Sequence, residues 1–497
     1  MAKFEASSST QVPSTVGAGA NQMKPYPLYL NGRWVRTQTT LAVVNPATAE
    51  TFAEVCTVAR VRVAEAVRDA HVAFQAWRQL TGKARGEYLR RVADELERRG
   101  EEIARTITKE NGKPLAQSKA EVAMSVDHLC WFAGEARRAY GRAVPHQVDS
   151  KRHLVIKTPM GVVGAISPWN FPLVLAVRKV APALAAGCTV ILKPASATPL
   201  SAVALAECAE AAKLPGGVFQ LVLGRSAEIA QEFLLNPLCR KITFTGSTEV
   251  GRTLIQGAAP VIKPLSLELG GHAPVLVFDD ADLDAAVEGA MIAKFRNTGQ
   301  SCVAANRIYV QRSTYERFLK LLTQRTCAMK VGDGLEDGVE IGPLINEDAV
   351  AKGVEHIQDA LRRGARLLCG GKRADRKGWF LEPTVLADVP PASLCMSEET
   401  FAPVAPVSPF DTDSEAIEMA NASPFGLSAY AFTRDISRAW RLMESLEAGT
   451  IGINDGVPTT SQCPFGGVKQ SGWGRELGIE GLDAFLETKH VSFGVRM

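Results

Sequence analysis

One cysteine, Cys302, lies in a polar, glycine-bearing segment, KFRNTGQSCVAANR (residues 294–307). A helical pattern precedes this segment, and the short β-branched run IYV lies at its end. A reactive thiol needs exposure and room for a substrate carbonyl, and the turn GQSCV offers small neighbours and free backbone amides. The chain has ten cysteines, so a loosely buried structural thiol is the simpler interpretation of any one of them taken alone.

Two other segments hold side chains suited to acid–base and oxyanion chemistry. Glu268 stands in LELGGHAP, where partial burial would raise the pKa of its carboxyl group and make it a usable general base. A surface glutamate at a strand end explains the same pattern equally well. Asn170 stands in SPWNFP, where Pro168 and Pro172 stiffen the turn, so that the Asn170 amide can donate to a developing oxyanion. The alternative is an asparagine that merely closes the turn.

Two further turns are of a type that binds cofactors. ILKPAS ends a predicted strand and leaves Lys193 and Ser196 at its carboxyl edge. FTGSTEVG ends another strand and opens a helix, so Gly246 and Ser247 are expected to present bare amides near a helix N-terminus, a natural phosphate site. Neither turn has the GxGxxG spacing, so the spacing alone is a weak indication of a dinucleotide.

The elements that must position these residues follow from the hydrophobic pattern. YPLYLNGRWV predicts a hairpin, and residues 61–141 show apolar residues at helical steps, with Gly112 as a plausible helix stop. From about residue 160 onward, short β-rich runs alternate with helical ones, which predicts βαβ units and a parallel sheet that binds ligands at the carboxyl ends of its strands. A second α/β series follows residue 304. KRHLVIKT and the C-terminal DAFLETKHVSFGVRM predict strands that pair either with a neighbouring subunit or as edge strands within one chain.

Length and composition restrict the class of protein. A chain of 497 residues predicts two or three domains, and a net charge of +3 without a long basic block gives no sign of nucleic-acid binding. No apolar stretch is long enough to span a bilayer. The cysteines form no CxxC and no cluster with the seven histidines, which argues against a zinc site or a disulfide framework and for the cytoplasm. Residues 1–24 are expected to be a disordered extension and not a secretory signal.

Several of these segments together resemble the aldehyde dehydrogenase superfamily. The match runs from about Tyr26 to the C-terminus, and the agreement of many motifs is far more specific than any one of them. KFRNTGQSCVAANR and LKPAS are most similar to succinate-semialdehyde dehydrogenase-like members. The motifs, in chain order, are PWNFP, LKPAS, FTGST, LELGG, GQSCVAANR, EETFAP and PFGGVKQSGWGRE.

The resemblance implies an α/β fold with a Rossmann-like parallel-sheet cofactor domain, a second α/β catalytic domain and a small β oligomerisation extension. A homodimer or homotetramer is expected. The implied boundaries are residues 25–143 and 160–271 for the dinucleotide-binding domain, 272–484 for the catalytic domain, and 144–159 and 485–497 for the oligomerisation strands.

The resemblance also implies roles in catalysis. Cys302 would attack the aldehyde to give a thiohemiacetal, with the oxyanion held by Asn170 and by the Cys302 amide. Loss of hydride to the nicotinamide of NAD or NADP would leave a thioester, and Glu268 would activate the water that hydrolyses it. Lys193 would hold the adenine ribose, Ser247 a phosphate, and Glu399 the nicotinamide ribose. The implied cofactor-binding residues are Ile166, Ser167, Pro168, Trp169, Lys193, Ser196, Gly246, Ser247, Leu269, Glu399 and Phe401.

The substrate implied by the resemblance is a small anionic aldehyde. Arg178 and Arg296 would bind its distal carboxylate, for which the planar guanidinium suits bidentate pairing. An isolated arginine usually forms a structural ion pair at a helix end. Two arginines at positions that match the family instead favour a role in binding the substrate. Thr459 takes the place of a serine in relatives, beside Pro458. The implied substrate-binding residues are Arg178, Arg296, Thr459, Phe171 and Phe465, and the candidates are succinate semialdehyde, glutarate semialdehyde or a sulfonated aldehyde.

Four positions depart from the family pattern. Ala402 replaces a glycine near the nicotinamide, where it is expected to alter cofactor motion. His272 replaces an asparagine; it could tune the charge of Glu268, but a hydrogen-bonded structural role is favoured. Ser196 lacks the carboxylate that excludes a 2′-phosphate, so NADP should be tolerated alongside NAD. Ala304 stands where some relatives have a second cysteine, so no local disulfide switch is predicted.

Three other classes of function fit parts of the pattern. A CoA-acylating dehydrogenase would use a thiol in place of water, but such relatives usually lack the base at Glu268. A cysteine hydrolase would use Cys302 without a nucleotide. A non-catalytic protein on this fold would not need Cys302, Glu268 and Asn170 together. Neither a membrane nor a nucleic acid is expected as a partner.

Overall fold

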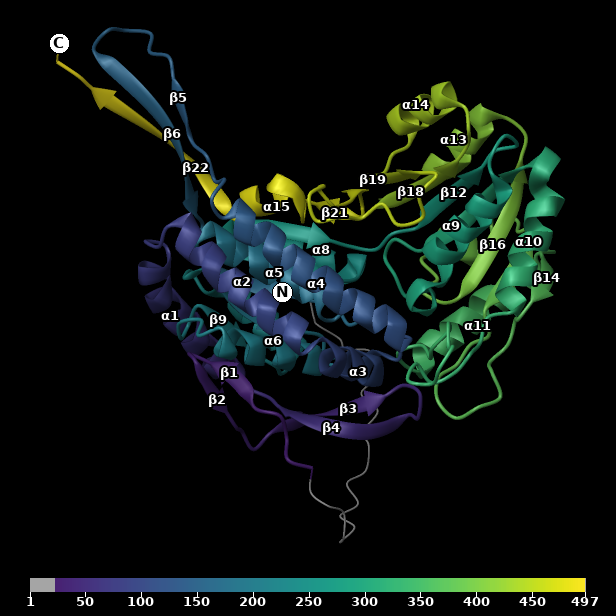
Figure 1. The fold of residues 1–497 in the computed structure, drawn as a ribbon, viewed down its shortest axis with the longest axis horizontal. Coiled ribbons are helices and arrows are strands. Elements are labelled where there is room, and N and C mark those ends of the chain that lie inside the picture. The colour runs from purple at the N-terminus through teal and green to yellow at the C-terminus, as the bar shows by residue number, and fades with distance from the viewer. Residues whose placement is uncertain (1–22, 497) are drawn as a thin grey trace.

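The computed structural model describes residues 23–496. The extension predicted for residues 1–24 therefore lies almost wholly outside the described residues. The described chain forms two units, each built on a sheet, and an arm of three strands that projects from one side (Figure 1).

The first sheet has the order β9-β8-β7-β10-β11, with all five strands parallel, and β21 joins it antiparallel beside β11. The order reverses between β7 and β10, and doubly wound sheets bind ligands at the carboxyl ends of the strands at such a point. The strands are β7 (Val162–Ile166), β8 (Thr189–Lys193), β9 (Phe219–Leu221), β10 (Cys239–Thr245), β11 (Leu265–Glu268) and β21 (Gly472–Trp473).

Helices cover both faces of this sheet, and each face has its own apolar core. The helical run predicted for residues 61–141 consists of four helices that end at Glu135, and Gly112 stops the third with a left-handed φ of 92°. The helices are α1 (Arg60–Trp77), α2 (Gly82–Arg98), α3 (Gly100–Asn111), α4 (Leu115–Glu135), α5 (Val174–Ala186), α6 (Leu200–Ala211), α7 (Ser226–Leu235), α8 (Thr248–Ala258) and the short η1 (Ala259–Val261).

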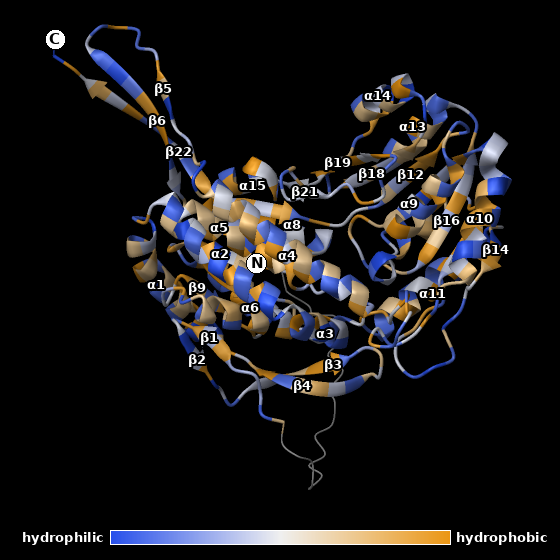
Figure 2. Cartoon of the chain, in the orientation of Figure 1, coloured by the Kyte–Doolittle hydropathy of each residue, from blue (hydrophilic) through white to orange (hydrophobic). Residues whose placement is uncertain are grey.

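The second sheet has the order β14-β15-β16-β13-β12-β18-β19 and is parallel except for β14. Its central strands are buried on both faces, because helices pack on each side, and Figure 2 shows β12 and β16 largely in the hydrophobic colour. The strands are β12 (Ala273–Val277), β13 (Ala305–Gln311), β14 (Arg366–Cys369), β15 (Thr384–Ala387), β16 (Val404–Phe410), β18 (Ser428–Phe432) and β19 (Thr450–Ile453). The helices are α9 (Leu283–Phe295), η2 (Arg296–Gly299), η3 (Arg312–Thr314), α10 (Tyr315–Cys327), α11 (Glu347–Arg362), α12 (Leu394–Ser397), α13 (Asp413–Asn421) and α14 (Ile436–Ser445).

The remaining elements are small. The predicted hairpin is β1 (Leu28–Leu30) and β2 (Arg33–Val35), with positive φ at Asn31 and Gly32 in its turn. Residues 468–473 return from the second unit to the first sheet, so the segment predicted as 272–484 contributes to both sheets. The others are β3 (Thr40–Asn45), β4 (Glu50–Cys56), β17 (Phe425–Gly426), β20 (Val468–Lys469) and α15 (Gly478–Asp483).

The arm consists of β5 (Arg142–Val144), β6 (Lys151–Pro159) and β22 (Leu486–Gly494). KRHLVIKT and the C-terminal run pair antiparallel with each other within one chain, in register from Leu486 opposite Pro159 to Gly494 opposite Lys151. Among residues 23–496, no helix combines the length and apolarity needed to cross a bilayer.

Candidate active site

Cys302 lies between the two sheets, just before β13 begins and close to the loop that joins β11 to β12. The two segments touch at Gly271, where a Cβ atom would approach the Cys302 carbonyl oxygen to 2.2 Å. Glycine is therefore required at this point of the LELGG motif by close packing. The thiol predicted to be reactive and the carboxylate predicted to be a base thus come from facing segments.

A strained loop presents Cys302. Three successive residues of η2, Asn297, Thr298 and Gly299, have φ between 51° and 75°, a region that non-glycine residues rarely adopt. Buried hydrogen bonds hold the loop: the Thr298 hydroxyl donates to the Gly342 carbonyl at 3.2 Å, and the Gln300 side chain accepts from the Ile345 amide at 2.9 Å. The polar composition around Cys302 is explained by these internal bonds.

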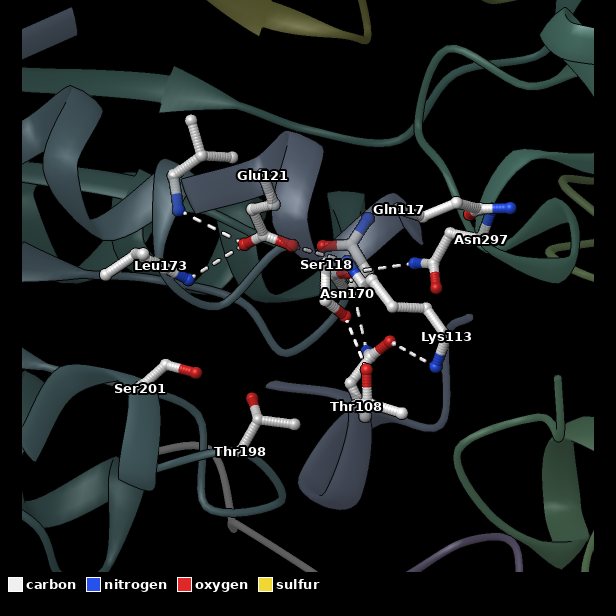
Figure 3. A network of polar contacts seen from close by, with 12 residues as sticks. Thr108, Lys113, Gln117, Ser118, Glu121, Asn170, Leu173, Thr198, Ser201 and Asn297 are labelled. Carbon is white, nitrogen blue, oxygen red and sulfur yellow. Dashed lines mark hydrogen bonds and ion pairs between the residues drawn. The ribbon is translucent and has the colours of Figure 1, made fainter. Parts of the chain in front are cut away.

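Asn170 is fixed by a buried polar network (Figure 3). Its carbonyl oxygen accepts from Lys113 Nζ at 2.7 Å and from Asn297 Nδ2 at 2.8 Å. Lys113 pairs with Glu121 at 2.6 Å, and Glu121 also accepts from the amides of Leu173 and Val174 at the start of α5. The Asn170 side chain donates from Nδ2 to the Gln300 carbonyl at 3.2 Å, which leaves one Nδ2 hydrogen for a ligand.

Glu268 ends β11 and is 4% exposed. Burial, followed by the nearby Glu476 carboxylate, raises the pKa of Glu268 well above its ordinary value. Its Oε2 atom has no hydrogen-bond partner among the described residues. The charge of Lys179 acts in the opposite direction on the pKa of Glu268. Lys179 donates to Glu476 at 2.6 Å and to the Thr245 hydroxyl at 2.6 Å. A carboxylate of this kind is able to take a proton from water.

The Cys302 thiol is held in its protonated form. Burial raises the pKa of Cys302 to about 12, and the carboxylates of Glu399 and Glu268 add to the shift. Arg178 acts in the opposite direction on the same pKa. The sulfur is therefore within electrostatic reach of three predicted site residues from separate parts of the chain.

Polar groups without partners mark the carboxyl ends of the first sheet, where a dinucleotide was predicted. Lys193 is 5% exposed and makes no hydrogen bond from Nζ to the described residues, and burial lowers its pKa to about 8. The hydroxyls of Ser167, after β7, and Thr248, at the start of α8, are buried without partners. These groups fit a ligand rich in hydroxyl and phosphate oxygens, as a nicotinamide dinucleotide is.

The second side of this site comes from the loop after α12. Glu399 accepts from the Gly271 amide at 3.1 Å, and burial raises the pKa of Glu399 to about 7. Phe401 has a left-handed φ of 55° and packs edge-on against Trp169, with ring centroids 5.5 Å apart. The remaining predicted cofactor residues lie around the same strand ends: Ile166 ends β7, Pro168 follows it, Ser196 is half-buried after β8, and the Leu269 amide donates to Ser471.

One expectation about this region is wrong. The Gly246 amide is not bare, because it donates to the Glu268 carbonyl at 3.0 Å and so continues the pairing of β10 with β11. Ser247 caps α8 by accepting from the Val250 amide at 3.4 Å. The amides open to a phosphate therefore begin at Ser247 and not at Gly246.

The two predicted substrate arginines line one cationic region. Arg178 is 6% exposed, its Nε is buried without a partner, and its guanidinium lies 4.9 Å from the centroid of Phe465. Arg296 lies 5.1 Å from the centroid of Phe171, whose ring also contacts Lys113. Neither arginine forms a salt bridge within the described chain. Burial lowers the pKa of each, and each guanidinium carries a charge in need of an anion.

Three positions noted in the sequence have local explanations. Thr459 is half-buried in the loop after β19, and its hydroxyl makes no hydrogen bond to the described residues, whereas Ser461 bonds to Asp127. His272 is buried and pairs through Nε2 with the Cys395 carbonyl at 3.2 Å, in keeping with a structural role. Ala402 is buried against α11, where a Cβ on Gly353 would lie 3.2 Å from its methyl group.

Sequence reasoning missed the charged residues that support the site. Lys113 and Glu121 are eight positions apart, and the partly polar run PLAQSKA between them gives no local signal of a buried ion pair. Lys179 and Glu476 are separated by 297 positions, so no local pattern could have joined them.

Comparison with known proteins places the chain among characterised relatives. The profile of the Aldehyde dehydrogenase family matches residues 34–491. The chain is 49% identical to the succinate-semialdehyde dehydrogenase [NADP(+)] of Escherichia coli, over 94% of this chain and 97% of that protein. It is also 49% identical to the glutarate-semialdehyde dehydrogenase of Pseudomonas aeruginosa, with the same coverage. The crystal structure of an E. coli NADP-dependent enzyme superposes with a TM-score of 0.94 at 48% identity, covering 95% of this chain and 98% of that one.

Proposed function

The chain belongs to the aldehyde dehydrogenase family, and from this premise we propose that it oxidises a small anionic aldehyde to the carboxylic acid with NAD or NADP. The observation that carries the proposal is Arg178, a buried guanidinium without a carboxylate partner that is electrostatically coupled to Cys302. A buried cation of this kind is costly unless a ligand pairs with it. Arg296, which lies against the ring of Phe171 and within electrostatic reach of Arg178, gives the ligand a second cation.

The first half of the reaction belongs to Cys302 and Asn170. The Cys302 thiol gives its proton to water as the sulfur attacks the aldehyde carbon, and the carbonyl oxygen becomes an oxyanion that accepts from Asn170 Nδ2 and from the Cys302 amide. The network beneath Asn170 fixes the direction of that donor. The nicotinamide cofactor, when bound, supplies the acceptor for the hydride. The thiohemiacetal on Cys302 thereby becomes a thioester.

The second half belongs to Glu268. Its raised pKa, with burial as the main cause, makes the carboxylate a stronger base than an exposed glutamate. The carboxylate takes a proton from water, the hydroxide attacks the thioester carbon, and the Cys302 sulfur leaves. A base at this place supports hydrolysis over transfer of the acyl group to CoA.

The candidate substrates share an anion at one end and an aldehyde at the other. Succinate semialdehyde is the first candidate because it is the substrate named for the E. coli relative, and glutarate semialdehyde follows from the P. aeruginosa relative. A sulfonated aldehyde presents the same charge to Arg178 and Arg296 and is the third. For the cofactor, Ser196 carries no charge that would repel a 2′-phosphate, so both NAD and NADP are proposed.

A panel of acidic and neutral aldehydes, each assayed with both cofactors, tests the proposal directly. Arg178→Ala should raise KM for acidic aldehydes by one to two decades, because loss of a charge-assisted contact costs about 1.5–3 kcal/mol. KM for a neutral aldehyde of the same length should change little. Equal effects on both types would contradict an anionic substrate.

Two controls separate the competing reactions. Reduced cofactor should form without CoA and at a rate that CoA does not raise, which distinguishes hydrolysis from acylation. Release of acid from an ester or thioester, with no reduction of the cofactor when an aldehyde is added, would instead identify a cysteine hydrolase. Arg178→Lys keeps the charge but loses the planar fork, so its KM for acidic aldehydes should fall between those of the native protein and Arg178→Ala.

A further inference from the structure

We propose that a groove at the base of the arm, remote in sequence from the catalytic residues, binds a small molecule that carries more than one phosphate group. The groove has a volume of about 410 Å³ and is formed where α1 ends, α2 begins, α4 ends and β6 leaves the body. Its charged lining consists of five cations and no carboxylate. They are Arg78, Lys83, Arg85, Arg137 and Lys157.

Most of this charge has no nearby compensation. Lys157 pairs with Asp483 at 3.2 Å, and Lys83 reaches Glu87 only at 3.9 Å. Arg78 and Arg137 form no salt bridge within the described chain. Cations gathered in a concave surface raise the local concentration of anions and repel one another when no anion is bound. A polyanion would remove this repulsion.

Arg85 gives the groove a fixed donor at its base. The residue is 9% exposed and lines the groove, with Nε donating to the Ala185 carbonyl at 2.9 Å and Nη1 to the Leu80 carbonyl. These two bonds set the plane of the guanidinium, which packs against Gly187. The other three N–H groups have no partner among the described residues, and no carboxylate balances the charge. A rigid guanidinium with free donors suits a phosphate.

The start of α2 adds backbone donors to the same groove. Thr81 caps the helix by accepting from the Ala84 amide at 3.2 Å, while the amides of Gly82 and Lys83 make no hydrogen bond within the described chain. Gly82 and Lys83 both line the groove. The N-terminus of a 17-residue helix favours an anion, so amides and guanidinium donors meet at one place.

The lining favours a small ionic ligand over a protein surface. None of the large apolar side chains that are exposed among residues 23–496 lies in the groove, whose apolar part is made of alanines, a proline and a buried leucine. Protein interfaces are usually centred on large apolar or aromatic side chains. Five cations from four elements line a groove of about 410 Å³, which offers charge and room for several phosphate groups on one molecule.

Isothermal titration of the full-length protein with inorganic tripolyphosphate tests this site. One ion should bind per chain, with an affinity that falls as salt is added. Arg78→Glu and Arg137→Glu should each weaken binding by at least about tenfold, a change equivalent to 1.4 kcal/mol. Both side chains are exposed, so their replacement leaves the bonds of Arg85 intact. Arg225→Glu makes the same charge change at an exposed position just before α7 and should leave the affinity unchanged.

Two further measurements exclude other sites. The titration is repeated with the protein saturated with NADP, and tripolyphosphate should still bind, because the groove is separate from the predicted phosphate site at Ser247. Light scattering gives the mass of each variant, which should equal that of the native protein. No binding, equal binding in all three variants, loss of binding with NADP, or a lower mass of the groove variants would each overturn the proposal; the last would identify a subunit interface.

Discussion

At the scale of single residues, the site combines a thiol and two carboxylic acids whose protonated forms are all favoured by burial. Cys302, Glu268 and Glu399 all have raised pKa values, with burial as the largest cause in each case. Each carboxylate disfavours the thiolate, and Arg178 favours it. Proton transfer from the thiol to a base must therefore accompany the attack on the aldehyde, because a free thiolate would be rare at neutral pH.

Glu268→Gln should separate the two halves of the reaction. The amide cannot take a proton from water, so a burst of reduced cofactor should be followed by a stall at the thioester, with the acyl group detectable on Cys302 by mass spectrometry. Cys302→Ala should bind cofactor but give neither burst nor acyl group. Steady turnover of Glu268→Gln at the native rate would assign the base to another residue.

Glu399 predicts a pH dependence of cofactor binding. If its carboxylate accepts hydrogen bonds from the nicotinamide ribose, only the ionised form binds well. With a pKa of about 7, the affinity should rise with pH. The ionised fraction grows about tenfold between about pH 6 and about pH 8, so Kd should fall by up to that factor. Fluorescence titration measures Kd, and Glu399→Gln should flatten the profile.

At the scale of elements, a buried ion pair joins three segments that build the oxyanion site. Lys113 follows α3, Glu121 lies on α4, and Asn170 follows β7, and the three are linked by bonds of 2.6 and 2.7 Å. Glu121 also holds two amides at the start of α5. The direction of the Asn170 side chain therefore depends on helices far from it in sequence.

Lys113→Met should lower both stability and turnover. The change leaves Glu121 buried without its cation, which typically costs about 3–5 kcal/mol, and it removes one of the donors to the Asn170 carbonyl. Thermal unfolding and kcat measure the two effects. In the double variant Lys113→Met, Glu121→Gln, the amide oxygen can still accept from Leu173 and Val174 without a buried charge, so the melting temperature should recover in part. A melting temperature below that of Lys113→Met would contradict an ionic cause.

The elements themselves could be predicted well from local pattern. The strands around Val163, Val190 and Phe244, and the stop at Gly112, follow from apolar periodicity and from one glycine. The loop before Cys302 could not, because Asn297 and Thr298 adopt left-handed backbone against their own preferences and are held by distant partners such as Gly342. The prediction of a bare amide at Gly246 was wrong for a related reason. That amide donates to the Glu268 carbonyl of β11, and the sequence does not show that β11 is the neighbour of β10.

At the scale of the whole molecule, one face of the arm carries exposed apolar side chains among charged ones, and a single chain leaves them in water. Leu154 and Ile156 alternate with inward-facing residues along β6 and are 40% and 38% exposed, and Phe493 on β22 is 47% exposed. Leu154 lies opposite Val491, and Ile156 opposite Lys489, so these side chains share one face of the sheet. Figure 1 shows this arm extending away from both units. Such a face is typical of a surface that another protein covers.

We expect this face to join copies of the chain into a homodimer or homotetramer. A charge placed among apolar contacts is strongly unfavourable once they are buried, so Leu154→Asp combined with Phe493→Asp should shift the mass toward that of the monomer. Thr488→Asp places the same charge on the opposite face of β22, where its partner is Lys157, and should leave the mass unchanged. Light scattering over a range of protein concentrations makes the comparison. A native protein that is monomeric throughout, or a Thr488→Asp variant that dissociates as readily, would assign the arm another role.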